Sequence, residues 1–262
     1  IEKPVSIEKL ITSVKDVLSK RITGEDVFSH LVQNIPAFKK TLDEMGLLVE
    51  QGNIFIIQSE EGEDKTAWCK ALHTMKFSEL GEFKKLELRE NESINDDGKN
   101  TFIESIEDKN NSTLFIQNID KLSESEREFI SKKLISHSDQ NALKIFIGVS
   151  EIEEVTVIDE KKLTTLTIPP LRSSLKEVPV ILDQTVKFFV DRDGHGYRRF
   201  SLAAQNMLSK YQWPGNLSQL VDLVQALLSR KDKEIVNVDE IQEIITLQGP
   251  GGNILIENNI LS

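Results

Sequence analysis

Short apolar runs alternate with amphipathic segments along the first two thirds of the chain. Apolar runs begin near Ile54, Thr113 and Lys144, and a shorter one precedes Ile168. Between these runs, apolar residues recur every three or four positions, which is typical of helices with one buried face. Buried strands that alternate with helices predict a mainly parallel sheet covered on both faces. The expected fold class is therefore α/β.

After Arg172 the pattern changes to helices only. One helix is predicted from about Pro179 to Val190, and a second follows Ser201. A third is predicted to begin at Asn216, with Gln219 placed to complete a capping box. We therefore expect a small helical lid. The buried stripe of the third helix consists of Leu217, Leu220, Val221, Val224, Leu227 and Leu228.

The stretch from Phe77 to Asn111 departs from both patterns. It is polar and acidic, and Asn91 to Asn100 is almost free of apolar residues. Such a composition predicts a variable, partly mobile excursion from the fold.

The first predicted strand leads through a polar turn into a helix, which is the local structure of a P-loop. The P-loop pattern, G-x-x-x-x-G-K-[ST], uses glycines so that backbone N–H groups can wrap phosphates, a lysine for the outer phosphates and a hydroxyl for Mg²⁺. Ser59 and Asp64 stand where the two glycines belong. Gly62, Lys65 and Thr66 remain, and they are the candidate nucleotide-binding residues.

The same turn carries carboxylates at Glu60, Glu61, Glu63 and Asp64. Each like charge facing a phosphate would cost on the order of 1 kcal/mol or more. Asp64 also has a structural role open to it, because its carboxylate can cap the helix that begins at Lys65. Two interpretations stay open: an acidic turn that caps a helix without any ligand, and a weak nucleotide site.

Net charge and residue composition argue against several kinds of binding site. The net charge of −11 argues against binding of a nucleic-acid backbone by this chain itself. The single cysteine, Cys69, excludes an internal disulfide and suits a reducing cytoplasm, where we expect the protein. The four histidines are scattered, so no metal site is expected. No apolar run approaches the roughly 18 residues of a membrane helix, and no membrane partner is expected.

Two motifs make a resemblance specific. Trp-Pro-Gly-Asn at 213–216 and Ile-Pro-Pro-Leu-Arg at 168–172 resemble the AAA+ domain of sigma-54-dependent transcription activators of the NtrC and NtrX type. Pro-Ala-Phe at 36–38 and Leu-Phe-Ile at 114–116 fall in the same order. Lys3-Pro4 before an amphipathic helix resembles the end of a response-regulator receiver domain. The resemblance covers nearly the whole chain and implies an AAA+-like P-loop NTPase fold plus an all-helical lid.

The resemblance also implies a division of the chain into domains. The expected parts are the C-terminal end of a receiver domain at 1–20, a linker at 21–35, a degenerate AAA+ α/β subdomain at 36–172, a helical lid subdomain at 173–246, and a linker or tail at 247–262.

Most of the residues that the family uses for ATP hydrolysis are absent here. The family's Asp-Glu pair, which helps to hold Mg²⁺ and orients the attacking water, is matched by Gln117 and Asn118. Its sensor asparagine is matched by Ser150 and its sensor arginine by Ser218. No arginine lies between residues 127 and 172, so the trans-acting arginine fingers have no counterpart. Neutral amides supply neither the charge that holds a hard cation nor a general base.

The Gly-Ala-Phe-Thr-Gly-Ala loop with which the family contacts sigma-54 is absent between residues 73 and 113. This absence predicts that sigma-54 is not bound. Together with the other losses it favours a pseudo-ATPase over an enzyme, with no catalytic residue, no metal and no resident cofactor, and with ATP bound weakly if at all.

The resulting hypothesis is a non-catalytic AAA+-like module of a two-component response regulator, acting in transcription regulation as an interaction or oligomerisation scaffold. The expected partners are further copies of the chain, a cognate sensor kinase through an upstream receiver domain, and RNA polymerase or a sigma factor. DNA would be bound only through a domain outside this chain.

Two alternatives stay open. One is a weakly active or nucleotide-binding ATPase of the sigma-54 activator type that uses Lys65 and Thr66, with Glu60 or Asp120 holding the metal. The other is a non-catalytic AAA+ relative outside transcription, such as a clamp-loader-like subunit.

Overall fold

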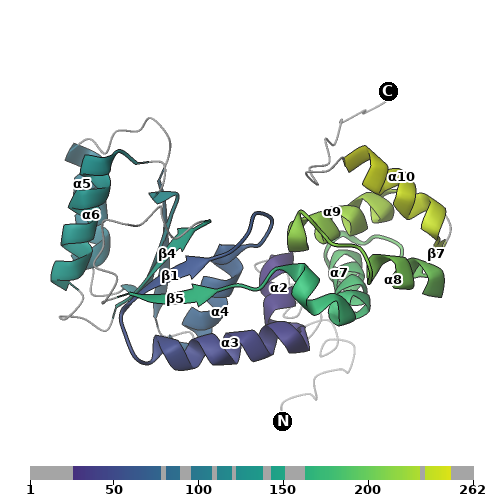
Figure 1. Cartoon of the computed structure of the whole chain (residues 1–262), viewed down its shortest axis with the longest axis horizontal. Coiled ribbons are helices and arrows are strands. Elements are labelled where there is room, and N and C mark those ends of the chain that lie inside the picture. Colours follow the sequence, from purple (N-terminus) through teal and green to yellow (C-terminus); the bar gives the residue numbers. More distant parts are fainter. Residues whose placement is uncertain are drawn as a thin grey trace, which may run out of the picture. The chain divides into compact units, whose positions relative to one another are not determined.

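The computed structural model describes residues 26–77, 81–88, 96–107, 111–119, 122–137, 143–150, 163–230 and 234–248. These residues form two compact units (Figure 1). The α/β unit lies within 36–173, and the helical unit combines 26–35 with the described residues after 173. The receiver-domain end expected at 1–20 lies outside the described residues, as does all but the start of the tail expected at 247–262.

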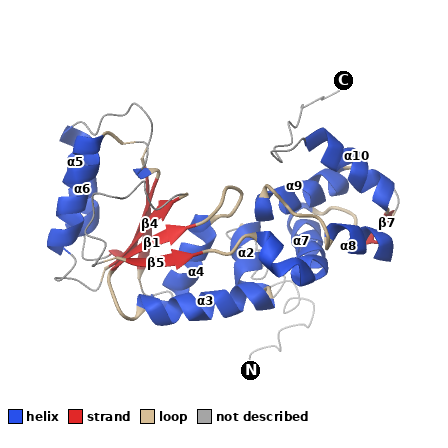
Figure 2. Ribbon diagram, viewed as in Figure 1, coloured by secondary structure: helices blue, strands red, loops and turns tan. Residues whose placement is uncertain are grey.

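The α/β unit contains a five-stranded sheet in the order β2-β3-β4-β1-β5, and all of its neighbouring strands are parallel. Strands β4, β1 and β5 of this sheet are labelled in Figure 2. Between β4 and the edge strand β5, Ile56 of β1 pairs with Ile147 of β4 and with Thr165 of β5. The parallel sheet predicted from the sequence is confirmed. The strands are β1 (Ile54–Gln58), β2 (Glu82–Glu87), β3 (Asn111–Gln117), β4 (Lys144–Val149) and β5 (Thr164–Thr167).

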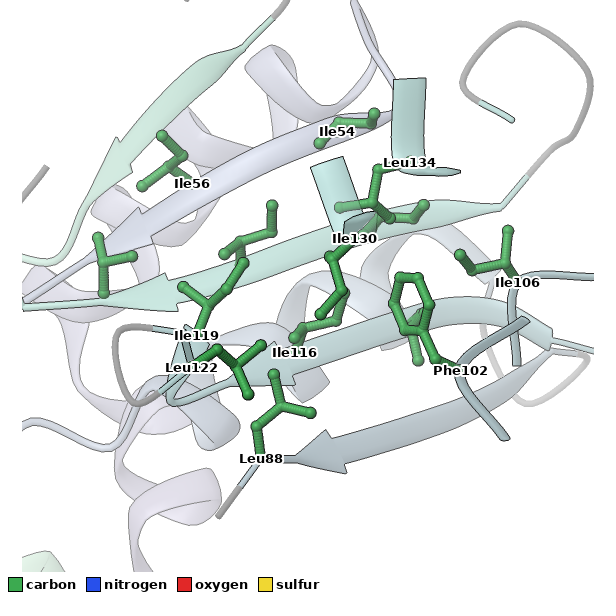
Figure 3. Packing of buried hydrophobic residues seen from close by; sticks show 14 of the residues in the cluster. Ile54, Ile56, Leu88, Phe102, Ile106, Ile116, Ile119, Leu122, Ile130 and Leu134 are labelled. Carbon is green, nitrogen blue, oxygen red and sulfur yellow. The ribbon is translucent and has the colours of Figure 1, made fainter. Parts of the chain in front are cut away.

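Helices cover both faces of the sheet. Alternate residues of β1, β3 and β4 form one buried cluster with Phe102 and Ile106 of α5 and with Ile130 and Leu134 of α6 (Figure 3). On the other face α4 packs against β3, and α3 packs against α4. These helices are α3 (Pro36–Val49), α4 (Lys65–Phe77), α5 (Asp96–Glu107) and α6 (Glu124–His137).

Strand β2 and helix α5 lie in the stretch that was expected to be a variable, partly mobile excursion. Residues 82–87 form a strand and residues 96–107 form a helix, and neither element was predicted from the sequence. Strand β2, Glu-Phe-Lys-Lys-Leu-Glu, pairs with β3 at an edge of the sheet and keeps most of its side chains at least partly exposed. An edge strand tolerates charged residues that a central strand excludes, so β2 lacks the apolar run that marks the other strands in the sequence.

The helical unit contains two short parallel strands and a set of helices. They are α2 (Val27–Asn34), the 3₁₀ helix η4 (Leu171–Glu177), which begins in the α/β unit, α7 (Val178–Asp193), β6 (Arg199–Phe200), α8 (Leu202–Leu208), α9 (Asn216–Ser229), β7 (Ile235–Val236) and α10 (Val238–Gln248).

Helix α2 falls within residues 21–35, where a connector was expected. Asp26 caps this helix, since the Ser29 backbone N–H donates to Asp26 Oδ1 at 2.8 Å. Leu31 is fully buried, and α2 packs against α7 with the ring centroids of His30 and Phe188 5.5 Å apart. Residues 27–34 are therefore a packed part of the helical unit, and 21–25 lie outside the described residues.

Helix α9 begins differently from the prediction. Its N-cap is Gly215, whereas Asn216, expected as the cap, is buried as the first helical residue with φ +48°. The Gln219 side chain nevertheless accepts a hydrogen bond from the Gly215 N–H at 3.1 Å. This contact spans four positions, whereas the predicted capping box joins Gln219 to the N–H of Asn216, which donates to the Trp213 carbonyl instead at 2.8 Å.

None of the helices in the described ranges combines the length and the apolar character needed to cross a bilayer.

Candidate nucleotide site

The turn that resembles a P-loop joins β1 to α4 at the carboxyl edge of the sheet. Ser59 is buried there; its backbone N–H donates to the Val149 carbonyl at 3.4 Å, and its hydroxyl donates to the Glu60 carbonyl at 3.1 Å. Gly62 has φ +85°, a conformation that favours glycine. One glycine of the turn is thus required by its backbone.

Asp64 caps helix α4. Its Oδ1 accepts a hydrogen bond from the Ala67 N–H at 3.1 Å, and its carbonyl accepts one from the Trp68 N–H at 3.4 Å. The predicted capping role of Asp64 is confirmed. The N-terminus of a helix attracts anions through its free N–H groups and its dipole. At α4 a carboxylate of the chain itself takes one of the donors that a phosphate would use.

Lys65 and Thr66 form the start of α4, and both are half-buried. The stem of Lys65 passes close to Gly148 of β4, because a Cβ added to Gly148 would lie 3.3 Å from Lys65 Cδ and 3.0 Å from the Phe115 ring. Gly148 therefore leaves room for the lysine stem, a role that the sequence did not reveal. That Gly62, Lys65 and Thr66 bind a nucleotide stays a prediction.

Glu60 faces Arg172, which follows the Pro-Pro-Leu run. The guanidinium donates to both carboxylate oxygens, from Nη1 to Oε2 at 2.6 Å and from Nη2 to Oε1. The Arg172 side chain is 41% exposed and the Glu60 side chain is 46% exposed. The hydrogen bond to Glu60 raises the pKa of Arg172. Glu60 lies in the P-loop-like turn and Arg172 ends the Ile-Pro-Pro-Leu-Arg motif, but the sequence gave no sign that they pair.

The residues that match the family's Asp-Glu pair follow β3 at the same edge of the sheet. Asn118 has φ +63°, and its Nδ2 donates to the Leu88 carbonyl at 3.2 Å, so its side chain ties β3 to the end of β2. Gln117 Oε1 is buried and accepts no hydrogen bond within the described part of the chain. Neither amide carries the charge that a hard cation needs.

The two sensor-matched serines lie in different units. Ser150 follows β4, and its carbonyl accepts a hydrogen bond from Gln58 Nε2 at 3.3 Å, which places it beside the end of β1. Ser218 lies in the first turn of α9, in the helical unit. The carboxyl edge of the sheet thus gathers the turn, both amides and Ser150, as parallel strands require.

Comparison with known proteins agrees with this architecture. Residues 172–253 match the family described as AAA+ ATPase lid domain. Among curated proteins, the nitrogen fixation protein AnfA of Azotobacter vinelandii is 32% identical over 72 residues, which cover 28% of this chain and 14% of AnfA. The DNA-binding transcriptional regulator NtrC of Azospirillum brasilense is 28% identical over 80 residues, which cover 29% of this chain and 16% of NtrC. The chain thus matches about a seventh of the length of these relatives.

Solved structures share the fold across most of the chain. NtrX from Brucella abortus in complex with ATP has a TM-score of 0.65 at 17% identity, covering 94% of this chain and 66% of that one. The same protein was crystallised with ADP. RuvB from Thermotoga maritima has a TM-score of 0.55 at 12% identity, covering 84% of this chain and 69% of that one. The expected AAA+-like fold and the resemblance to NtrC- and NtrX-type regulators are confirmed.

Proposed function

Because this chain has the AAA+ fold and carries an AAA+ ATPase lid domain whose relatives are transcription regulators, we propose that it is a non-catalytic module of such a regulator. In this role it acts as an interaction and oligomerisation scaffold rather than as an ATPase. The fold that positions a nucleotide is kept, and the chemistry that hydrolyses it is lost.

The observation that carries this proposal is the contact of Asp64 with the N-terminus of α4. A nucleotide phosphate at this place would need the N–H groups that the helix presents, and it would meet the Asp64 carboxylate already bonded to one of them. Like charges at this range repel by about 1 kcal/mol or more even in a well-solvated setting. Nucleotide binding would therefore have to displace the cap and overcome the repulsion.

The carboxyl edge of the sheet supports the same conclusion. Asn118 is engaged with the Leu88 carbonyl, and Gln117 is neutral. Phosphoryl transfer depends almost wholly on positioning and on charge stabilisation by metal ions and cationic side chains. Among the described residues, Gln117 and Asn118 stand where the family has its metal-binding and water-orienting carboxylates, and neutral amides support hydrolysis poorly.

A second candidate function is a nucleotide-binding module without strong catalysis. It is favoured by Lys65 and Thr66 at the start of α4, and by the complexes of Brucella abortus NtrX with ADP and ATP. In that case nucleotide would serve as a structural ligand of the scaffold.

Calorimetric titration of the whole chain with ATP and with ADP, each with Mg²⁺, separates the two functions. A site with a Kd of about 1 mM binds with about −4 kcal/mol and is detectable at millimolar nucleotide. We expect no heat beyond that of dilution. Binding that Lys65→Ala abolishes, and that Lys70→Ala on the exposed side of the same helix leaves unchanged, would contradict the proposal and establish the second candidate.

A gain-of-binding variant tests the physical reason. Ser59→Gly combined with Asp64→Gly returns both glycines and removes the carboxylate from the helix N-terminus. We expect this double variant to bind nucleotide more tightly than the natural chain. If the double variant is folded but binds no nucleotide, then Ser59 and Asp64 are not what prevents nucleotide binding.

The scaffold role implies self-association, which sedimentation velocity over a range of protein concentrations measures directly. We also propose a cognate sensor kinase, acting through an upstream receiver domain, and RNA polymerase or a sigma factor as partners of the whole regulator. DNA binding would belong to another domain. A chain that stays monomeric at all accessible concentrations, with and without ATP, would argue against the oligomerisation part of the proposal.

A further inference from the structure

The Glu60–Arg172 ion pair joins two segments that are 112 positions apart in the sequence. One is the turn at 59–64 of the candidate site. The other is the segment 168–173, by which the chain leaves the α/β unit. Glutamate and arginine meet through two parallel hydrogen bonds, the geometry in which a guanidinium fork binds a carboxylate most specifically.

A backbone contact joins the same two parts of the chain. The Ile168 N–H donates to the Gln58 carbonyl at 2.8 Å, immediately before the turn. The Ser173 N–H then donates to the Pro170 carbonyl at 2.9 Å, and Leu171 is fully buried. The exit segment is therefore held at its start by β1, at its middle by Leu171, and near its end by the side chain of Arg172 on the turn.

We propose that the Glu60–Arg172 pair is a latch that couples the conformation of the turn to the exit segment. When the pair is closed, the turn and the segment are held together. An event that moves either Glu60 or Arg172 breaks the pair and frees both the turn and the exit segment. A change at the turn is thereby transmitted to the part of the chain that leads into the helical unit. This inference deepens the proposed function, because it gives the nucleotide-free turn a regulatory role within the scaffold.

The charge and exposure of the pair suit a releasable contact. Both side chains are between a third and a half exposed, so water and salt can reach them. An ion pair at such a site is held weakly enough to open, unlike a buried pair, whose separation would leave an uncompensated charge. The bidentate geometry supplies specificity, and the exposure supplies reversibility.

Hydrogen exchange followed by mass spectrometry on the whole chain, without nucleotide, tests the latch. The reporter amides are those of Ile168 and Ser173 in the exit segment and of Ser59 and Glu63 in the turn. Glu60→Gln should speed exchange at Ile168 and Ser173 by roughly twofold to fivefold, the range expected for loss of an exposed ion pair. Arg172→Gln should speed exchange at Ser59 and Glu63 by a similar factor.

Two controls make the result specific. Glu61→Gln removes the same charge one residue away and should leave the exit segment unchanged. The exchanged pair, Glu60→Arg with Arg172→Glu, should restore slow exchange in both segments. The differences between the natural chain and the single variants should also shrink at about 1 M salt, where charges are screened within about 3 Å.

The proposal is overturned if each single variant affects only the segment that contains it, or if the exchanged pair restores neither. It is also overturned if exchange rises equally in α9, since that would indicate general destabilisation rather than coupling. These outcomes are independent of calorimetry: a chain that binds ATP could still have the latch, and a chain without the latch could still be free of nucleotide.

Discussion

At the scale of single residues, Asp64 illustrates how one substitution changes what a turn can do. A glycine in its place would leave the N–H groups of α4 open to a ligand, whereas the aspartate uses its own side chain on the Ala67 N–H. Capping is a local interaction, so it could be predicted from the sequence alone. The same carboxylate caps the helix and, under the proposed function, repels phosphate, and the two effects can be measured separately.

Asp64→Ala should lower the free energy of unfolding by about 1 kcal/mol, the usual effect of removing an aspartate N-cap. Urea denaturation followed by circular dichroism measures this change. Glu63→Ala, at the neighbouring position, is the control and should stay within about 0.5 kcal/mol of the natural chain. Equal losses for both variants would mean that the cap contributes no more than the general charge of the turn.

His73 gives the α/β unit a pH-dependent stability. The ring is buried on α4, with Nδ1 2.8 Å from Thr113 Oγ1 and the Phe83 ring centroid 5.6 Å away. Burial lowers the pKa of His73 from its ordinary 6.5, in spite of a hydrogen bond with the Gly81 backbone. Protonation is therefore less favourable in the folded state than in the unfolded chain.

The direction of the effect follows from linkage. The unfolded chain binds more protons than the folded one once the pH falls below about 6.5, so the stabilising contribution is complete above this pH and is lost as the pH drops toward the folded pKa. We expect thermal melting curves to show a loss of stability as the pH falls below about 6.5. His73→Gln should flatten that slope. An unchanged slope in His73→Gln would assign the effect to other groups.

At the scale of elements, sequence reasoning succeeded where burial is strongest. All residues of β4 are buried, and so are all of β1 except Gln58, so each appears in the sequence as a continuous apolar run. The edge strand β2 has a charged sequence and was missed, together with α5 beside it. A run of apolar residues in the sequence indicates a buried strand, and a partly exposed edge strand does not need such a run.

The contacts of the candidate site also differ in whether the sequence could predict them. The roles of Asp64 and of the conformation at Gly62 depend on neighbours within a few residues, and the first of these was predicted. The pairing of Glu60 with Arg172 depends on the folded sheet, which brings β5 beside β1. No local pattern contains that information, so this contact could be found only in the structure.

Helix α7 ends on Gly194, which has φ +71° and whose N–H donates to the Val190 carbonyl at 3.0 Å. Space is no obstacle to a side chain here, since no atom lies within 4 Å of the position that a Cβ would take on Gly194 or on Gly196. Gly194→Ala should therefore destabilise the protein by about 1 kcal/mol through the left-handed conformation alone.

Gly196→Ala is the matched control for Gly194→Ala, because Gly196 has equal space and no positive φ. It should be neutral or slightly stabilising. Chemical denaturation of both variants measures the difference between them. Equal stability of the two variants would show that the left-handed end of α7 relaxes without cost.

At the scale of the whole molecule, charge limits what this chain can bind. The sequence carries a net charge of −11, and its adjacent arginines are used internally. Arg198 is buried and donates to the Leu227 carbonyl and to Glu240, while Arg199 pairs with Glu234. Arg198 is thus committed to the interior of the helical unit, and Arg199 already faces a carboxylate.

The chain by itself should therefore leave duplex DNA unbound. Fluorescence anisotropy of a labelled duplex should not change up to about 10 μM protein at physiological salt, a concentration at which many non-specific binders already associate. A relative of known DNA-binding activity serves as the positive control. Binding that weakens steeply with added salt would show that a basic surface outweighs the net charge.

Because Cys69 is buried, the rate at which its thiol is labelled can report local opening of the structure around α4. Its thiol is the one cysteine in the sequence and is completely buried on α4, where burial raises its pKa well above the ordinary value. Thiol reagents react with the thiolate, so labelling requires that α4 first open away from its neighbours. The ratio of the labelling rate of Cys69 to that of a free thiol therefore measures how often α4 opens. The first turn of this helix borders the candidate site, so no added probe is needed there.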